Sequence, residues 1–266
     1  MADELLPRFV RVPAGEFTMG ADDGDEDERP AHRVFVDAFH LAIHPITNDQ
    51  YADFVRQRPH PVPALRELPR VVTPAQEPAF RELAGAYAWR GGKMPKERGR
   101  HPVTLVAYTD AAMYCRWLGE QIGQPVRLAT EAEWERAARG GVDGRHYPWG
   151  DDIDPSRANF LPEPALKRHR GTRPVGSYPS NAFDLSDMVG NVWEWVADWY
   201  RPDAYRNGDQ RNPRGPSIGR LRLIRGGSWV THDVRQLRCA HRHEVPVDTY
   251  AYSIGFRVAY SDDRKA

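Results

Sequence analysis

The 266-residue sequence contains only two cysteines, Cys115 and Cys239. Two cysteines can form one bridge at most, so a small scaffold held together by several disulfides is excluded. Cys115 lies on an apolar helical stripe and Cys239 lies in a short strand-like run. Both settings favour buried free thiols over a disulfide.

An excess of charge of either sign is also absent, because 37 lysines and arginines balance 37 aspartates and glutamates. Such a chain has no global field that would attract nucleic acid or an anionic membrane. No apolar run approaches the ~18 residues that a membrane-spanning helix needs. Met1–Pro7 is acidic where a secretory signal would be apolar. We therefore expect no nucleic-acid partner, no membrane partner and no secretory signal.

Tryptophan, tyrosine, proline and glycine, by contrast, are abundant. This profile is typical of a loop-rich α+β domain with small sheets and aromatic packing. The length fits one large domain, and we find neither an internal repeat nor a low-complexity linker. The simplest account is a single domain over residues 1–266.

Local patterns predict several regular elements. Phe9–Gly20 is typical of a strand, a turn and a second strand, and Val34–Ile43 of a further strand region. Capping boxes that begin at Thr47 and Thr130 predict two helices. A third helical stripe ends at Gly123, a residue type that terminates helices.

Other stretches carry no sustained period. Residues 58–100 combine many prolines with many charges, which predicts a long loop. We interpret the acidic run Asp22–Glu28 as a solvated loop, because consecutive carboxylates cannot all face one ion; a cation site is the alternative. Beyond Gly150 the pattern predicts mostly turns and brief strands.

Several motifs occur in an order that resembles the formylglycine-generating enzyme, or sulfatase-modifying factor, family. They include Val12–Gly20, Arg127–Gly141, Asp187–Trp195, Arg225–Trp229 and Gly255–Val258. The resemblance covers nearly the whole chain apart from residues near 56–100 and 200–220. It implies a C-type-lectin-like α+β fold with little regular secondary structure, stabilised in part by calcium.

The copper-dependent oxidases of that family place two reactive cysteines just after the Gly-Gly-Ser segment. The matching positions here hold Thr231 and Gln236. Copper(I) favours soft thiolates, whereas these side chains are hard and redox-inert, so we expect no copper. Trp193 and Ser228 match residues that line the oxidase pocket, which is therefore expected to persist. Ser228 beside His232 would be a candidate nucleophile, but nothing in the sequence positions a third group.

The family's second calcium site maps by resemblance onto the side chains of Asp187 and Glu194 and the carbonyls of Gly190 and Val192. Calcium takes six to eight oxygen ligands, many of them loop carbonyls, and all four positions are compatible with this requirement. The alternative is that Glu194 pairs with a nearby arginine.

The family's first calcium site is expected to be weak or absent. Asn159 and the carbonyl of Phe160 match its ligands, but Lys167 occupies the position of its acidic ligand, with His169 two residues further on. An ammonium group cannot ligate calcium.

The residues after the Gly-Gly-Ser segment are expected to line a C-terminal cleft that binds a ligand. Histidines and a glutamate among them suggest a transition-metal site; polar residues at the rim of an open cleft are the favoured alternative. The helical histidine domain that carries iron in related sulfoxide synthases has no counterpart in residues 1–266, so we expect no iron site of that kind. The predicted ligand-binding residues are Thr231, His232, Asp233, Arg235, His241, His243, Glu244, Tyr250 and Tyr252.

The resemblance also bears on the cellular compartment. Secreted members pair the cysteine matching Cys115 with one matching Val258, and the cysteine matching Cys239 with one matching Ala138. Each bridge has lost one partner here. A reducing, cytoplasmic setting is therefore expected.

Three functions remain open. The favoured one is a calcium-stabilised pseudoenzyme that binds a peptide, protein or small molecule. As a special case it would be a variable protein diversified by a retroelement over Val230–Gln236, His241–Glu244 and Val247–Ser253. The second is a cysteine-independent oxidoreductase acting on a small metabolite or peptide in a biosynthetic pathway, as in the pyoverdine-maturation relatives. The third is a formylglycine-generating oxidase with other metal ligands.

Overall fold

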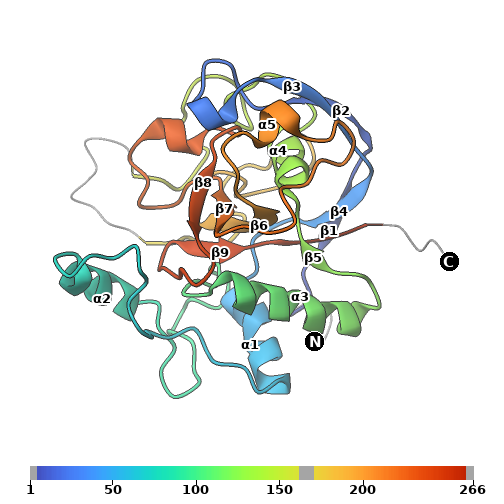
Figure 1. Ribbon diagram of the computed structural model, residues 1–266. Helices are drawn as coiled ribbons and strands as arrows, with labels where there is room; N and C mark the ends of the chain where they lie inside the picture. Colours follow the sequence, from blue (N-terminus) through green and yellow to red (C-terminus); the bar gives the residue numbers. More distant parts are fainter. Residues whose placement is uncertain (1–4, 162–170, 262–266) are drawn as a thin grey trace.

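The computed structural model describes residues 5–161 and 171–261 (Figure 1). Its strands form three sheets, with the orders β1-β4-β10-β5, β2-β3 and β8-β7-β6-β9. The strands are β1 (Phe9–Val12), β2 (Gly15–Met19), β3 (His32–Val36), β4 (Phe39–Ala42), β5 (Arg127–Leu128), β6 (Trp193–Trp199), β7 (Leu221–Arg225), β8 (His243–Pro246), β9 (Ile254–Phe256) and β10 (Val258–Ser261).

Helices surround these small sheets. In the sheet that contains β6, this strand pairs antiparallel with β7 and parallel with β9. The helices are α1 (Asn48–Gln57), α2 (Glu77–Gly85), α3 (Tyr108–Ile122), α4 (Glu131–Arg139) and α5 (Ala204–Asn207), with short 3-10 helices η2 (Glu26–Glu28) and η4 (Val234–Leu237). Figure 1 shows α1, α2 and α3 on one side of this sheet and β2, β3 and α5 on the other. The predicted α+β class is confirmed.

Both predicted capping boxes are present. The Thr47 hydroxyl accepts a hydrogen bond from the amide of Gln50, and the Thr130 hydroxyl accepts one from the amide of Glu133. Each helix thus satisfies an amide that has no partner within its first turn. Gly123, in the left-handed conformation, ends α3 as predicted.

Phe9–Gly20 forms the two predicted strands, of which β1 pairs with β4 and β2 pairs with β3. Two other local predictions need correction. Residues 58–100 are not loop throughout, because they contain α2, where buried Phe80 and Ala84 drive packing. The acidic run is not fully solvated either: Glu28 is completely buried in η2.

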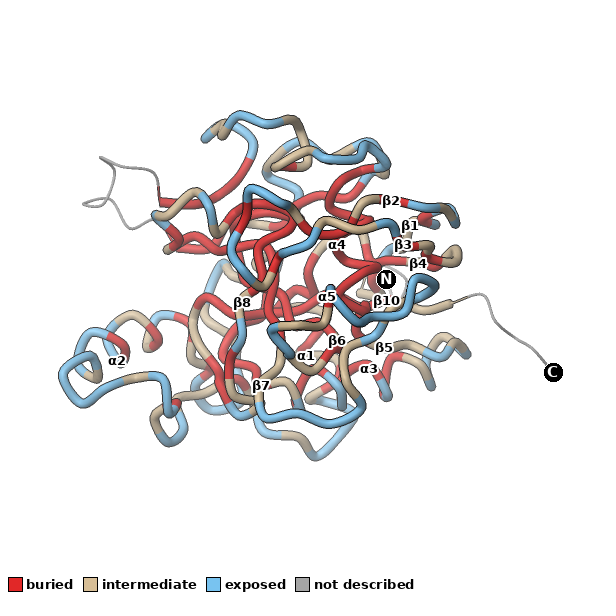
Figure 2. The backbone as a smooth tube through the Cα atoms, turned by 45° about the horizontal axis from the view of Figure 1, so that its top comes forward, coloured by how far each residue is buried: buried red, intermediate tan, exposed pale blue. Residues whose placement is uncertain are grey.

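A buried charged network joins α4 to the Gly-Gly-Ser segment. Arg225 lies 2.5 Å from Glu131 and 2.8 Å from Glu135, and it also donates to the carbonyl of Cys239 at 2.6 Å. Burial lowers the pKa of Arg225, but Tyr205 and the two glutamates outweigh that effect and raise it. Figure 2 shows that α4, β6 and β7 are mostly buried.

The two cysteines are free and buried, as predicted. Burial raises the pKa of Cys239 to about 12 and raises that of Cys115 further. Both groups therefore remain neutral thiols at physiological pH. No helix within residues 5–161 and 171–261 has the length and apolar character needed to cross a bilayer.

Candidate functional site

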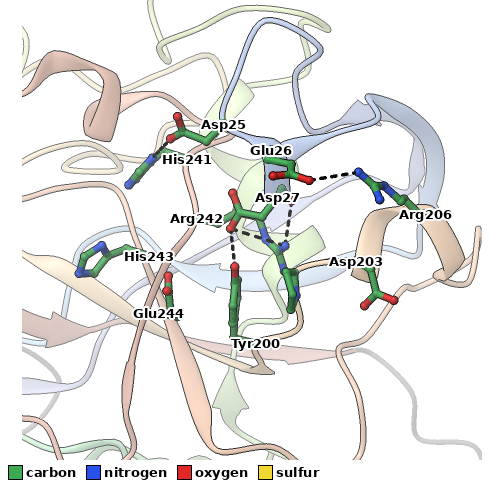
Figure 3. Close-up of a pocket in the computed structure, with 11 residues that line it drawn as sticks. Asp25, Glu26, Asp27, Tyr200, Asp203, Arg206, His241, Arg242, His243 and Glu244 are labelled. Atoms are coloured by element: carbon green, nitrogen blue, oxygen red, sulfur yellow. Dashed lines mark hydrogen bonds and ion pairs between the residues drawn. The ribbon is translucent and has the colours of Figure 1, made fainter.

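A pocket of about 630 Å³ opens between η2, the segment that follows β6, and the start of β8 (Figure 3). Three separate parts of the chain supply its walls, so the fold and not a single motif creates it. Its lining residues are Asp25, Glu26, Asp27, Tyr200, Pro202, Asp203, Arg206, His241, Arg242, His243 and Glu244.

The pocket is acidic. Five carboxylates and two guanidinium groups line it, which gives a formal charge of −3 when its histidines are neutral. Much of this charge is compensated, because four of the five carboxylates have an arginine within 4.0 Å: Asp25 has Arg238, Glu26 has Arg206, Asp27 has Arg242 and Asp203 has Arg201. Tyr200 also donates a hydrogen bond to Asp27. Glu244 is exposed on β8. The remaining negative potential favours a positively charged occupant.

Aromatic rings form the inner wall of the pocket. The ring of His243 stacks on Trp193 with centroids 5.0 Å apart, and His241 lies 6.3 Å from His243. Burial, together with the charge of His241, lowers the pKa of His243 to about 4. His243 is therefore neutral near pH 7 and presents an uncharged face. Trp193, a predicted pocket residue, supports this wall from β6.

The residues predicted to line the oxidase pocket, apart from Trp193, lie outside the lining of the acidic pocket, and two of them contact each other. The Thr231 hydroxyl accepts a hydrogen bond from the amide of Ser228 at 3.0 Å, and both residues are buried. No hydrogen bond joins Ser228 to His232 in the described part of the chain, and His232 is exposed. Gln236 is half-buried, and its amide donates to the carbonyl of Asp233. Within residues 5–161 and 171–261, no contact would activate Ser228 as a nucleophile.

The other predicted cleft residues do not line the pocket. Asp233 caps η4 and pairs with Arg235 at 2.7 Å on the surface. The Tyr250 hydroxyl donates to the carbonyl of Glu67 at 2.7 Å, and Tyr252 packs against Phe80. Residues 65–85 therefore fill the side of the cleft where the two tyrosines lie. Of the predicted ligand-binding set, only His241, His243 and Glu244 line the pocket.

The predicted second calcium site lies beside a buried arginine. Arg257 donates to both carboxylate oxygens of Glu194 at 2.8 Å, and Trp134 donates to one of them. The pairing that we gave as the alternative is thus present. It does not use every lone pair, because a carboxylate has about four acceptor positions and Glu194 engages three.

Among the described residues, no cation forms an ion pair with the carboxylate of Asp187, and Arg257 donates only to its backbone carbonyl. Its carboxylate accepts a hydrogen bond from the amide of Gly176 at 2.7 Å, and the side chain is buried. Burial raises the pKa of Asp187 to about 6. A buried carboxylate of this kind fits a cation ligand, so Asp187, Gly190, Val192 and Glu194 remain our predicted calcium ligands.

The predicted weak site is only partly described, because Lys167 and His169 lie outside the described residues. The Asn159 side chain donates to the carbonyl of Gly171 and to the side chain of Asn191. The backbone carbonyl of Asn159 accepts a hydrogen bond from the backbone amide of Asn191. Phe160 is buried next to it. These bonds tie Asn159 to the loop that contains Gly190, which accounts for its conformation without an ion.

Comparison with known proteins agrees with this fold. Residues 2–262 match the family described as sulfatase-modifying factor enzyme 1-like domain. The chain belongs to this family. It is 36% identical to the formylglycine-generating enzyme of Streptomyces coelicolor, over 96% of this chain and 89% of that protein.

Two further relatives matter here. The chain is 37% identical to the serine/threonine-protein kinase Pkn1 of Chlamydia trachomatis over 96% of its own length, but it spans only 38% of that protein. The structure of PvdO from Pseudomonas aeruginosa superposes with a TM-score of 0.79 at 29% identity, covering 97% of this chain and 95% of PvdO. Family membership with a whole-chain fold match is thereby shown.

Sequence reasoning gave a cation site in Asp22–Glu28 only as the alternative to a solvated loop, and it did not single out Asp25 and Glu28. Together with His241 they form the one group of three potential metal-ligating side chains in the described part of the chain. The acidic run was the available signal. It could not reveal the contact, because His241 is more than 200 residues away along the sequence.

Proposed function

We propose that this family member is a ligand-binding domain that does not carry out cysteine-dependent oxidation. The observation that carries the proposal is the pairing of two features. Thr231 and Gln236 stand where the resemblance places reactive cysteines, and the Thr231 hydroxyl is engaged by Ser228. The acidic pocket of about 630 Å³ lies instead between η2 and β8.

The chemistry of the lining indicates the class of ligand. The carboxylates attract a cationic group electrostatically, and the face of an aromatic ring such as that of Tyr200 can contact the cation. We therefore infer a small molecule or peptide that carries an amine or guanidinium group. Calcium bound through Asp187 and Glu194 would stabilise the scaffold without touching the ligand.

Binding of organic cations tests this proposal. Isothermal titration with alkyl amines and guanidines should give saturable binding that weakens as salt is raised, because salt screens the carboxylates. Glu244→Gln should weaken it about 5-fold, as expected for one partly exposed charge worth about 1 kcal/mol. Glu82→Gln, an exposed change of the same kind on α2, should have no effect.

The comparison ligands are carboxylates of the same size and neutral amides. Tighter binding of the carboxylates would contradict the proposal, as would an equal loss of affinity in Glu82→Gln. A complete failure of all cations to bind would leave the pocket without the assigned function and refute it.

Oxidation of a peptide with the sequence Cys-x-Pro-x-Arg is expected to fail even with copper supplied. Both thiols of this chain are buried and have raised pKa values, so neither can replace the missing cysteines as a copper ligand. Mass spectrometry of the peptide checks this result. Conversion of its cysteine to formylglycine would show that other residues perform the oxidase chemistry.

A cysteine-independent oxidoreductase is the second candidate. One observation favours it: Asp25, Glu28 and His241 supply nitrogen and oxygen donors suited to a transition metal. The binding proposal requires fewer assumptions, because it needs only the pocket and its charge.

A further inference from the structure

Asp25, Glu28 and His241 converge at one end of the pocket although they come from opposite ends of the chain. The Nδ1 atom of His241 lies 3.4 Å from the Asp25 carboxylate and 3.6 Å from that of Glu28. The potential ligand atoms of all three residues lie within 4.8 Å of one another. Figure 3 shows His241 and Asp25 facing each other across the pocket wall.

Two of these side chains have buried polar atoms without partners. Both ring nitrogens of His241 and the Oε2 atom of Glu28 are inaccessible and make no hydrogen bond. The His241 side chain is 9% exposed and that of Glu28 is fully buried. A buried polar atom without a partner costs about 1–3 kcal/mol, so such atoms in a cluster point to a missing ligand.

The spacing fits metal ligation better than direct hydrogen bonding. Ligands about 2.05 Å from a tetrahedral zinc ion lie roughly 3.3–3.4 Å apart. The separations of 3.4 and 3.6 Å are near this value, whereas a good N–H···O bond is shorter. Asp25 is 51% exposed and can close the remaining distance.

Arg238 is the competing cation. Its guanidinium donates to Oε1 of Glu28 at 2.7 Å and lies 3.9 Å from Asp25. Arg238 thus engages the same Oε1 atom that lies 3.6 Å from His241, and it leaves Oε2 of Glu28 without a hydrogen bond. Gly24 permits the arrangement, because a Cβ atom there would lie 2.1 Å from Oε2.

We propose that Asp25, Glu28 and His241 bind a divalent transition metal ion such as Zn²⁺. One imidazole and two carboxylates form a mixed nitrogen and oxygen ligand set that suits zinc and similar divalent ions. Asp25 and His241 also line the pocket, so an ion held by the three side chains would be reached from it. The site does not depend on the proposed organic ligand.

Metal titration of the full-length protein tests the site. Chelator-treated protein in saturating calcium is titrated with Zn²⁺ by calorimetry and with Co²⁺ by visible absorption. One equivalent should bind, with the intense d–d bands of a four-coordinate Co²⁺ centre. Asp25→Asn and His241→Asn should each weaken Zn²⁺ binding at least 10-fold, because each removes one ligand.

Glu26→Gln is the matched control, since it removes a neighbouring carboxylate that is 92% exposed and outside the cluster. It should leave Zn²⁺ affinity within 2-fold of the wild type. Circular dichroism establishes that each variant is folded; if the buried His241→Asn change unfolds the chain, half-exposed Asp25→Asn decides the matter.

Absence of stoichiometric Zn²⁺ and Co²⁺ binding would overturn the inference, as would equal affinity in the wild type and Asp25→Asn. Organic cations are titrated into the same preparation. Cation binding without metal binding refutes only the metal site, and metal binding without cation binding refutes only the proposed function.

Discussion

Replacing Arg225 with methionine is expected to lower the free energy of unfolding by about 3 kcal/mol, near the lower end for breaking a buried ion pair. Arg225 is fully buried between Glu131 and Glu135. Methionine preserves most of the volume but leaves both carboxylates short of a cation. Arg242 and Arg139 still pair with them, which keeps the loss from being larger.

Chemical denaturation with far-ultraviolet circular dichroism measures this loss. Arg220→Met serves as the control, because Arg220 is exposed immediately before β7. We expect the control to change the free energy of unfolding by less than about 0.5 kcal/mol. Equal stabilities for Arg225→Met and the wild type would mean that the network contributes nothing net to folding.

This network gives the Arg225–Ser228 motif a structural role. Gly226 has a φ of +94°, and a Cβ atom there would lie 2.7 Å from the carbonyl of Met188. Gly226 also accepts a hydrogen bond from the amide of Gly190. Packing thus accounts for the arginine and the glycine at these positions.

Signals within one or two turns of the chain predicted the helices well. The hydroxyl of Thr47 and the glycine at position 123 act on their own neighbours, so their effects can be read locally. Strand pairing was less accessible, because β1 and β2 are adjacent in sequence but belong to different sheets. Helix α2 was missed because the many prolines and charges of residues 58–100 predicted a loop. One of those prolines, Pro78, lies in the first turn of α2, where proline is well tolerated.

The pocket shows the same limit. His241, His243 and Glu244 lie close together in sequence, and they were predicted as a group. The acidic residues next to His241 are Asp25, which precedes η2, and Glu28 within it, and no local pattern connects either of them with His241. The charge of the acidic run was visible, but the depth at which its last member is buried depends on the complete fold.

Calcium and pH should act through the same carboxylate, Asp187. Burial raises its pKa from an ordinary value of 3.8 to about 6, so the folded state favours the protonated form. The resulting destabilisation is absent below pH 4, grows as pH rises to 6 and is complete above that. A shift of about two pH units corresponds to about 3 kcal/mol.

Asp187→Asn removes the titrating group and retains an oxygen that can accept the bond from Gly176. Without calcium, the variant should therefore match the wild type near pH 4 and exceed it by up to about 3 kcal/mol at pH 7. Comparing the two proteins cancels other groups, including His243, whose lowered pKa acts in the opposite direction. Denaturant titrations at several pH values measure the difference.

Calcium should reverse this order at pH 7. An ion held by Asp187 and Glu194 would stabilise the wild type by about 2.7 kcal/mol at a concentration 100 times its dissociation constant. The variant, without one charged ligand, should respond far less. Asp184→Asn, an exposed neighbour, should behave as the wild type throughout. If calcium stabilises the wild type and Asp187→Asn equally, or stabilises neither of them, the ion does not bind at Asp187. This conclusion holds whatever the pH difference proves to be.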